Sequence, residues 1–89
     1  MAIVLVTYDL RAPGRNYQPV WDYLKTFTYC KGLESVWLLD TTTPTTAIRD
    51  KLKGLIDAND RMFVVKITND WASYGYTCGD WLNKPERRW

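Results

Sequence analysis

The feature that most constrains the fold is a short apolar run near the N-terminus. Residues 3–6 are Ile-Val-Leu-Val, and Pro13 and Gly14 follow soon after. Successive side chains of a strand point to opposite faces, so a strand of this composition is apolar on both of them. Such a strand belongs at the centre of a sheet that is covered on both sides. A fold for this chain therefore needs two layers of cover for one central strand.

Two stretches have the spacing of amphipathic helices that would cover one face of such a sheet. The first is expected over residues 17–27, with Pro19 tolerated in its first turn. The second is expected to begin with Thr43 as the N-cap and Pro44 at the first helical position, and to end near Asn59. Apolar residues recur at helical spacing on one face of each stretch: Tyr17, Val20, Trp21 and Leu24 in the first, and Ile48, Leu52, Leu55 and Ile56 in the second.

The remaining regular elements are expected to be strands. They lie over residues 2–10, 26–31, 35–41 and 61–68, and the second and third form a hairpin that turns near residues 31–33. The order of elements is then β-α-β-β-α-β. This order predicts an α+β, ferredoxin-like fold, in which an antiparallel sheet carries both helices on one face and an aromatic C-terminal tail follows.

The second face of the central strand needs a cover that the two helices do not provide. We assign residues 1–68 to the ferredoxin-like domain and residues 69–89 to a C-terminal extension, which holds three Trp and two Tyr. Either this extension packs on the open sheet face, or a second copy of the chain does, with the extension lying across the interface. We therefore expect a homodimer or a higher homo-oligomer.

The absence of histidine narrows the chemistry open to the 89 residues. It excludes Ser-His and Cys-His catalysis, histidine general bases and zinc sites that contain histidine. Two cysteines cannot form a thiolate cage for zinc. The chain shows no secretory signal and no apolar run long enough to span a membrane. We therefore expect a cytoplasmic protein in which Cys30 and Cys78 are reduced thiols.

Asp9 is the most informative of the ten acidic residues. It ends the first strand, where a carboxylate is costly unless it is solvated, paired or bound to a metal. One interpretation is a strand-end residue that hydrogen-bonds the following loop. The other is a magnesium ligand, for which a second chain would supply the second carboxylate. In that case Asp9 is both the metal ligand and the catalytic residue of a magnesium-dependent phosphodiesterase.

Arginines beside aromatic residues suggest a second kind of site, because they combine phosphate pairing with base stacking. The net charge of +2 is weak for a protein that binds duplex nucleic acid, whereas a nucleotide or a short single strand needs fewer phosphate contacts. Our candidate ligand-binding residues are Tyr8, Arg11, Arg15, Ser35, Trp71, Arg87 and Arg88.

Two segments carry a family resemblance. Residues 4–10, Val-Leu-Val-Thr-Tyr-Asp-Leu, resemble the first strand of the CRISPR-associated protein 2 family, and residues 34–38, Glu-Ser-Val-Trp-Leu, are similar to its Ser-Val-aromatic strand. Virulence-associated protein D has a similar strand that ends in Asp. Small bacterial and phage proteins described as SinR-like show the same order of motifs from residue 4 to about residue 68.

The resemblance implies a ferredoxin-like homodimer. In members reported as nucleases, the residue that matches Asp9 would bind a metal at the dimer interface, whereas spacer-acquisition members also act as non-catalytic scaffolds for DNA. This chain departs from them after Asp9, where Arg11 and Arg15 replace a dense arginine cluster, and in the Trp and Gly content of its tail.

Three functions follow as hypotheses. The first is a non-catalytic, homo-oligomeric protein that binds nucleotides or short nucleic acid, for example a phage protein that sequesters a cyclic nucleotide signal. The second is a magnesium-dependent endoribonuclease or phosphodiesterase that uses Asp9 at a dimer interface. The third is a protein-interaction module that uses the sheet edge or the aromatic tail.

Overall fold

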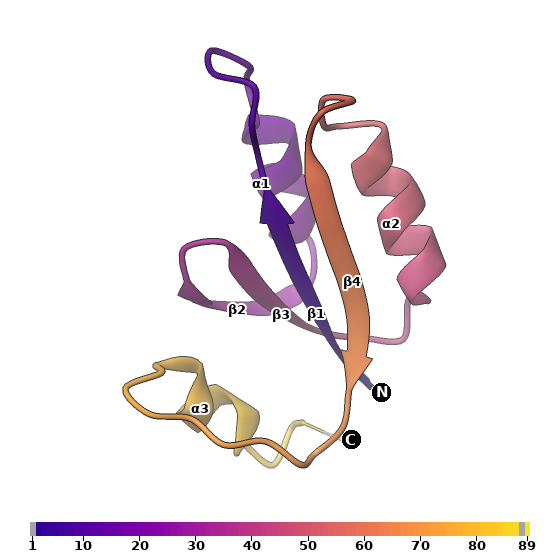
Figure 1. Cartoon of the computed structure of the whole chain (residues 1–89). Helices are drawn as coiled ribbons and strands as arrows, with labels where there is room; N and C mark the ends of the chain where they lie inside the picture. The colour runs from indigo at the N-terminus through magenta and orange to yellow at the C-terminus, as the bar shows by residue number, and fades with distance from the viewer. Residues whose placement is uncertain (1, 88) are drawn as a thin grey trace.

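The computed structural model describes residues 2–87 and residue 89 (Figure 1). It is an α+β structure with a four-stranded antiparallel sheet and short helices. The first six elements follow the predicted order β-α-β-β-α-β, and a further helix lies in the C-terminal extension. The elements are β1 (Ala2–Asp9), α1 (Gln18–Leu24), β2 (Thr28–Leu33), β3 (Val36–Thr41), α2 (Thr45–Lys53), β4 (Arg61–Ile67) and α3 (Cys78–Leu82).

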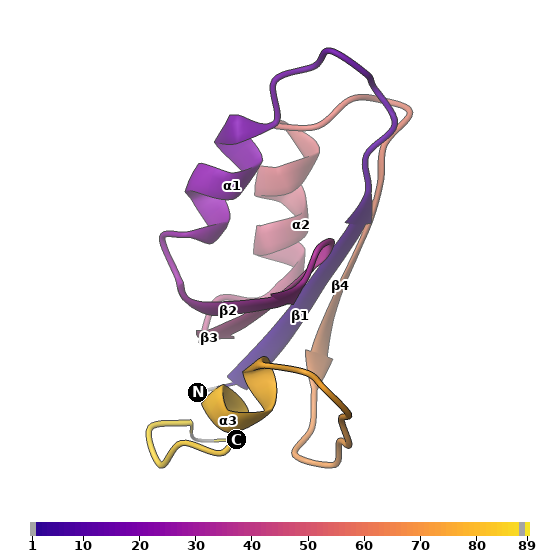
Figure 2. The ribbon, with the colours of Figure 1, turned by 90° about the vertical axis from the view of Figure 1, so that its left-hand side faces the viewer.

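The strand β1 is central, as its composition predicts. The strand order is β2-β3-β1-β4, and Leu5 of β1 lies opposite Leu38 of β3 and Val65 of β4. Helices α1 and α2 lie side by side on one face of the sheet, whereas α3 lies near the end of the sheet where the two chain termini are found (Figure 2). None of the helices over the described residues has the length and apolar composition that crossing a bilayer requires.

The main core fills the space between the sheet and the helices α1 and α2. Alternate residues of β1 and β3 point into it, and each helix contributes residues from its apolar face. Helix α1 presents the residues that the 3.6-residue spacing selects, which confirms its predicted orientation. The buried members are Val4, Val6, Trp37, Leu39, Val20, Leu24, Ile48 and Leu52.

The opposite face of the sheet, which we call the tail-side face, is covered by the C-terminal extension near one end. There Ile3 and Leu38 are buried against Cys78 and Leu82 of α3. Farther along the same face the cover stops, and Phe63 of β4 is 62% exposed. The second face of β1 is therefore packed at its N-terminal end and open toward its C-terminal end.

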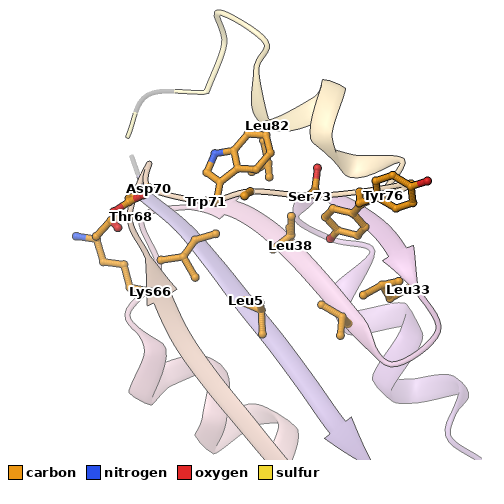
Figure 3. A pocket seen from close by; sticks show the side chains of 15 residues that line it. Leu5, Leu33, Leu38, Lys66, Thr68, Asp70, Trp71, Ser73, Tyr76 and Leu82 are labelled. Atoms are coloured by element: carbon orange, nitrogen blue, oxygen red, sulfur yellow. The ribbon is translucent and has the colours of Figure 1, made fainter.

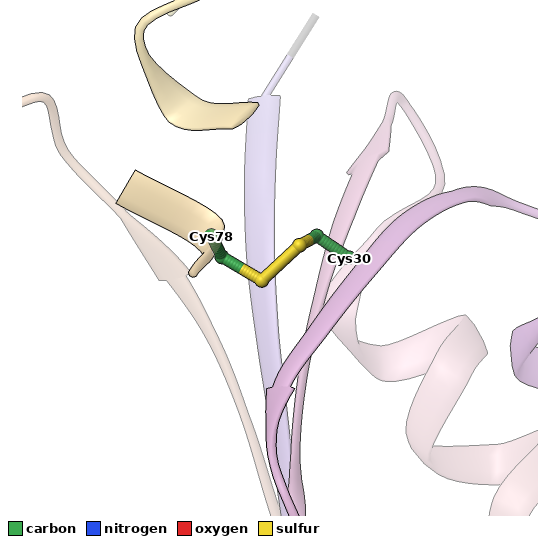
Figure 4. The surroundings of a disulfide bond; sticks show 2 residues. All are labelled: Cys30 and Cys78. Atoms are coloured by element: carbon green, nitrogen blue, oxygen red, sulfur yellow. A yellow bond between two sulfur atoms is a disulfide. The ribbon is translucent and has the colours of Figure 1, made fainter. Parts of the chain in front are cut away.

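Cys30 and Cys78 form a disulfide, so the expectation of two reduced thiols is wrong (Figure 4). Cys30 lies on β2 opposite Leu38, on the tail-side face, and α3 begins at Cys78 over the same region. Their Cα atoms are 5.9 Å apart, within the usual range for a disulfide. The two cysteines are 48 positions apart in the sequence, and they come close only because the extension folds back over the sheet. The sequence pattern therefore did not predict this disulfide.

The helix ends differ from the predicted ones. Helix α1 ends at Leu24 rather than at residue 27. The N-cap of α2 is Pro44, and its side chain makes no capping bond. The backbone N–H of Thr43, the predicted N-cap, instead donates to the hydroxyl of Thr41. Helix α2 ends at Lys53, with Gly54 as its C-cap, before the predicted stop near residue 59.

The hairpin between β2 and β3 is shifted from its predicted position. The two strands leave Glu34 and Ser35 as the turn, whereas the expected turn lay at residues 31–33. A register irregularity between Cys30 and Leu33 explains the shift, because it inserts extra length into β2 and lets the strand continue past Gly32.

Candidate functional site

Three of the predicted site residues meet where β1 ends beside the β2–β3 turn. Tyr8 and Asp9 lie at the end of β1, and Ser35 lies in the turn. They line a pocket of about 410 Å³, which we call the strand-end pocket. Its other lining residues are Leu10, Trp21, Lys31 and Glu34.

The strand-end pocket has an aromatic wall with a cation over it. The rings of Tyr8 and Trp21 have centroids 5.3 Å apart, and Trp21 stacks on the buried Trp37 at 6.4 Å. The ammonium of Lys31 lies 5.6 Å from the ring centroid of Trp21 and 5.4 Å from that of Trp37. These cation–π contacts hold the positive charge of an otherwise flexible side chain over the wall.

Tyr8 joins this wall to the hairpin through hydrogen bonds. Its hydroxyl accepts a bond from the indole N–H of Trp37 at 3.0 Å and donates to the backbone carbonyl of Glu34 at 3.4 Å. Burial raises the pKa of Tyr8 above its ordinary value, as does the charge of Glu34, while the bond from Trp37 acts in the opposite direction. Tyr8 is therefore a neutral phenol at physiological pH and acts as a hydrogen-bonding group.

Asp9 forms an exposed ion pair with Arg11. Oδ2 of Asp9 is 2.7 Å from Nη2 and 2.8 Å from Nε of Arg11, and both side chains are more than half exposed. A pair this exposed contributes only about 0–1 kcal/mol, so a ligand can displace either partner at little cost. Among the residues that the structure describes, no group of three or more His, Cys, Asp or Glu side chains is placed to hold a metal ion.

Asp60 holds the loop that carries Arg11, a role that the sequence did not suggest. Its carboxylate accepts bonds from the backbone N–H of Arg11 at 2.6 Å, from the hydroxyl of Tyr17 at 2.6 Å and from the backbone N–H of Asp57 at 2.8 Å. Burial alone would raise the pKa of Asp60, but these bonds outweigh it and lower the pKa below its ordinary value. Arg11 and Tyr17 lie 49 and 43 positions from Asp60 in the sequence, so no local pattern predicted their bonds to it.

Arg15 lies on the same loop but is turned toward the segment after α2. Its guanidinium is 3.8 Å from the carboxylate of Asp57, and it donates to the backbone carbonyl of Leu55 at 3.5 Å. It does not line the strand-end pocket. Among the predicted arginines that the structure describes, Arg11 is therefore the one placed beside this pocket, through its pairing with Asp9.

The candidates in the C-terminal extension lie on the tail-side face, apart from the strand-end pocket. Arg87 is buried, pairs with Asp40 at 2.9 Å and lies 3.9 Å from the ring centroid of Trp81. A guanidinium that is buried and already paired is not open to a phosphate, so the predicted ligand-binding role of Arg87 is not supported. The predicted role of Arg88 falls outside the described residues.

Trp71 lines a second and larger cavity of about 740 Å³, which we call the tail-side groove (Figure 3). Leu5, Leu38 and Ile67 of the sheet form its floor, and residues 70–76 of the extension form one wall. The indole N–H of Trp71 donates to the side chain of Asn69 at 3.1 Å. The structure therefore separates Tyr8 and Ser35, which line the strand-end pocket, from Trp71, which lines the tail-side groove on the opposite face of the sheet.

No protein-family model matches this chain, and no solved structure matches it. What the two cavities bind must therefore be inferred from the residues that line them. The strand-end pocket combines aromatic rings, a lysine, a serine and an exposed ion pair, whereas the tail-side groove is mainly apolar.

Proposed function

We propose that this chain forms a homo-oligomer that binds a nucleotide or a short nucleic acid at the strand-end pocket without cleaving it. The observation that carries the proposal is the ammonium of Lys31 held over the rings of Trp21 and Trp37, beside Tyr8. An aromatic wall offers a surface for base stacking, and a nearby cation pairs with phosphate. The exposed Arg11 supplies a second cation once a ligand displaces Asp9.

A modest number of cations suits a small ligand better than a duplex. The net charge is +2, and Asp9 and Glu34 offset part of the positive charge around the pocket. Duplex binding generally needs many phosphate contacts on a strongly basic face. Two pockets related by a dimer axis would suit a ligand with two equivalent halves, such as a cyclic dinucleotide. Sequestration of such a signal by a phage protein is one form that this function would take.

The finer fold and family assignments belong to the same proposal. The strand order, with β1 and β3 central, supports a ferredoxin-like arrangement. Together with the motifs at residues 4–10 and 34–38, it supports membership of the CRISPR-associated protein 2-like and SinR-like group. We propose a bacterial or phage protein that acts in the cytoplasm. Self-association would cover the exposed side chains of Leu33 and Tyr74, which line the tail-side groove, and that of Phe63.

The replacement Lys31→Ala tests the binding site. We expect calorimetric titration with a panel of mononucleotides, cyclic dinucleotides and short oligonucleotides to show binding of at least one member by the wild-type protein. Lys31→Ala should weaken that binding by about tenfold or more, because a hydrogen bond to a charged group contributes about 1.5 kcal/mol or more. Lys84→Ala, an exposed lysine of the extension, is the matched control and should bind normally. No heat with any ligand, or equal affinity in Lys31→Ala, would refute the proposal.

The nuclease hypothesis retains one supporting observation, which is the exposure of the Asp9 carboxylate. Its side chain is 56% exposed and pairs at the surface with Arg11, a pairing that a magnesium ion would replace. One carboxylate per chain is a poor magnesium site, so a partner chain would have to bring a second. The residues described in one chain therefore do not by themselves fit the metal.

Incubation with RNA and DNA in the presence of magnesium separates the two hypotheses. We expect both substrates to stay intact with the wild-type protein, as with Asp9→Asn. Cleavage by the wild-type protein that is lost in Asp9→Asn, and kept in the surface control Asp22→Asn, would instead establish the nuclease. Asp22 is a suitable control because it is exposed on α1, where its carboxylate accepts a hydrogen bond from the side chain of Gln18.

A further inference from the structure

The C-terminal extension is joined covalently to the edge of the sheet. Cys78, the first residue of α3, is fully buried, whereas its partner Cys30 is partly exposed on β2. Cys30 lies on an edge strand and is the more exposed residue of the pair, so we take its sulfur as the one that a reagent attacks. Figure 4 shows the bond passing from β2 to the start of α3.

Beside the disulfide, the extension packs closely against β2 at Gly32. A Cβ atom added to Gly32 would collide with the ring of Tyr76 and would lie 2.9 Å from the sulfur of Cys78. The absence of a side chain at Gly32 is what allows residues 76–78 to lie so close to the strand. Residues 70–76, which lead into this contact, form the wall of the tail-side groove. The disulfide therefore fixes the position of that wall.

We propose that the Cys30–Cys78 disulfide is a redox switch, whose reduction releases residues 69–82 from β2 and opens the tail-side groove. A thiolate of a dithiol reductant attacks the sulfur of Cys30, forms a mixed disulfide with it and expels the thiolate of Cys78, which takes up a proton. The second thiol of the reductant then attacks the mixed disulfide. This step leaves Cys30 as a thiol and the reductant as a disulfide, so two electrons and two protons have been transferred.

The other attachments of the extension in this region are apolar contacts, in which Trp71 and Tyr76, both partly exposed, pack against the cluster of Ile3, Leu38, Cys78 and Leu82. Helix α3 has five residues, too few to persist without its packing. Leu82 packs with Ile3 and Leu38, and Arg87 pairs with Asp40, so these two residues attach the segment after Cys78 to β1 and β3. The inference uses the cytoplasmic location proposed above, where disulfides are usually transient and redox-sensing. It does not depend on the strand-end pocket, which lies on the other face.

Amide hydrogen exchange in the oxidised protein and in the protein reduced with dithiothreitol tests the switch. The backbone N–H groups of Gly79 and Asn83 report on α3, since they donate to Tyr76 and Gly79 respectively. We expect reduction to accelerate their exchange by about 30- to 1,000-fold, the equivalent of about 2–4 kcal/mol of lost constraint. Amides of β3, such as that of Leu39, should keep their protection. Fluorescence of an apolar dye should rise as the groove opens.

The double replacement Cys30→Ser, Cys78→Ser is the matched control. It should exchange at the rate of the reduced wild-type protein, with or without dithiothreitol. Unchanged exchange of the α3 amides on reduction would overturn the proposal. Equal acceleration of the α3 and β3 amides would also overturn it, because it would show global unfolding in place of a local release. If the double variant does not fold, the comparison of exchange in the oxidised and reduced wild-type protein still tests whether reduction releases the extension. Nucleotide titration of both forms tests the strand-end pocket separately.

Discussion

Replacing Arg87 with methionine should lower the free energy of unfolding by about 3–5 kcal/mol, because it leaves a buried carboxylate without its partner. The side chains of Arg87 and Asp40 are 7% and 3% exposed, and their charged atoms are 2.9 Å apart. Methionine keeps much of the length and the packing against Trp81 but removes the charge and the hydrogen bond. The loss of stability therefore reflects mainly the unpaired charge of Asp40, and a cavity contributes less.

Urea denaturation followed by far-ultraviolet circular dichroism measures this loss. Arg49→Met is the matched control, since Arg49 pairs with Asp50 on the surface, where both side chains are more than half exposed, and should cost less than about 1 kcal/mol. The double replacement Asp40→Leu, Arg87→Met removes both charges and should recover most of the loss, because apolar residues often replace a buried ion pair without cost. If the double variant is as unstable as Arg87→Met, the unpaired charge is not the cause.

This ion pair shows where inference from the sequence stops. Asp40 has the pattern of a strand-end residue, and Arg87 that of an exposed arginine in a basic, aromatic tail. Nothing local relates them, because they are 47 positions apart and meet only once the extension has folded over the sheet. The same holds for Cys30 and Cys78. Contacts that depend on the path of the extension therefore could not be predicted.

The central elements were predictable because their patterns are local. The apolar run at residues 3–6 requires a central strand, and alternate residues of it do face two separate cores. The order of the first six elements follows from hydrophobic spacing. The predicted ends of two elements were less accurate. Helix α2 stops before Gly54, its C-cap, and the register irregularity lets β2 continue past Gly32.

The candidate site was predicted in part for the same reason. Tyr8 and Asp9 were predicted at the end of β1, and Ser35 was predicted at the start of the second hairpin strand, next to the turn in which the structure places it. Lys31 and Trp21 were missed as pocket residues. Trp21 has the spacing of a residue on the apolar face of α1, and the register of β2 decides which face of the sheet Lys31 occupies. That register depends on the irregularity between Cys30 and Leu33, which the sequence pattern did not reveal.

Trp37→Ala should destabilise the fold by about 3–5 kcal/mol, the usual range when a buried aromatic ring is removed. Trp37 is the largest of the fully buried side chains and is 1% exposed. Its ring stacks with Trp21 and packs against Tyr29, so its loss leaves a cavity bordered by side chains that cannot all collapse into it. Denaturant unfolding followed by circular dichroism measures the change.

Trp37→Phe separates packing from hydrogen bonding at the same position. It keeps an aromatic ring but removes the N–H that donates to Tyr8, which should cost about 1 kcal/mol for the bond beyond the effect of the smaller ring. Because that bond lowers the pKa of Tyr8 against the effect of burial, its removal should raise the pKa of Tyr8 further. Ultraviolet absorbance of tyrosinate during an alkaline titration measures this shift.

The two replacements should also differ in ligand binding, which links the core to the strand-end pocket. Trp37 lies under Lys31, so an alanine there removes one of the two rings that hold the ammonium in place, whereas phenylalanine retains a ring. Under conditions in which both variants are folded, Trp37→Ala should bind nucleotide more weakly than Trp37→Phe does. Equal affinity in the two variants would mean that the position of Lys31 does not depend on this ring. In that case Trp21 alone would form the aromatic support of the pocket.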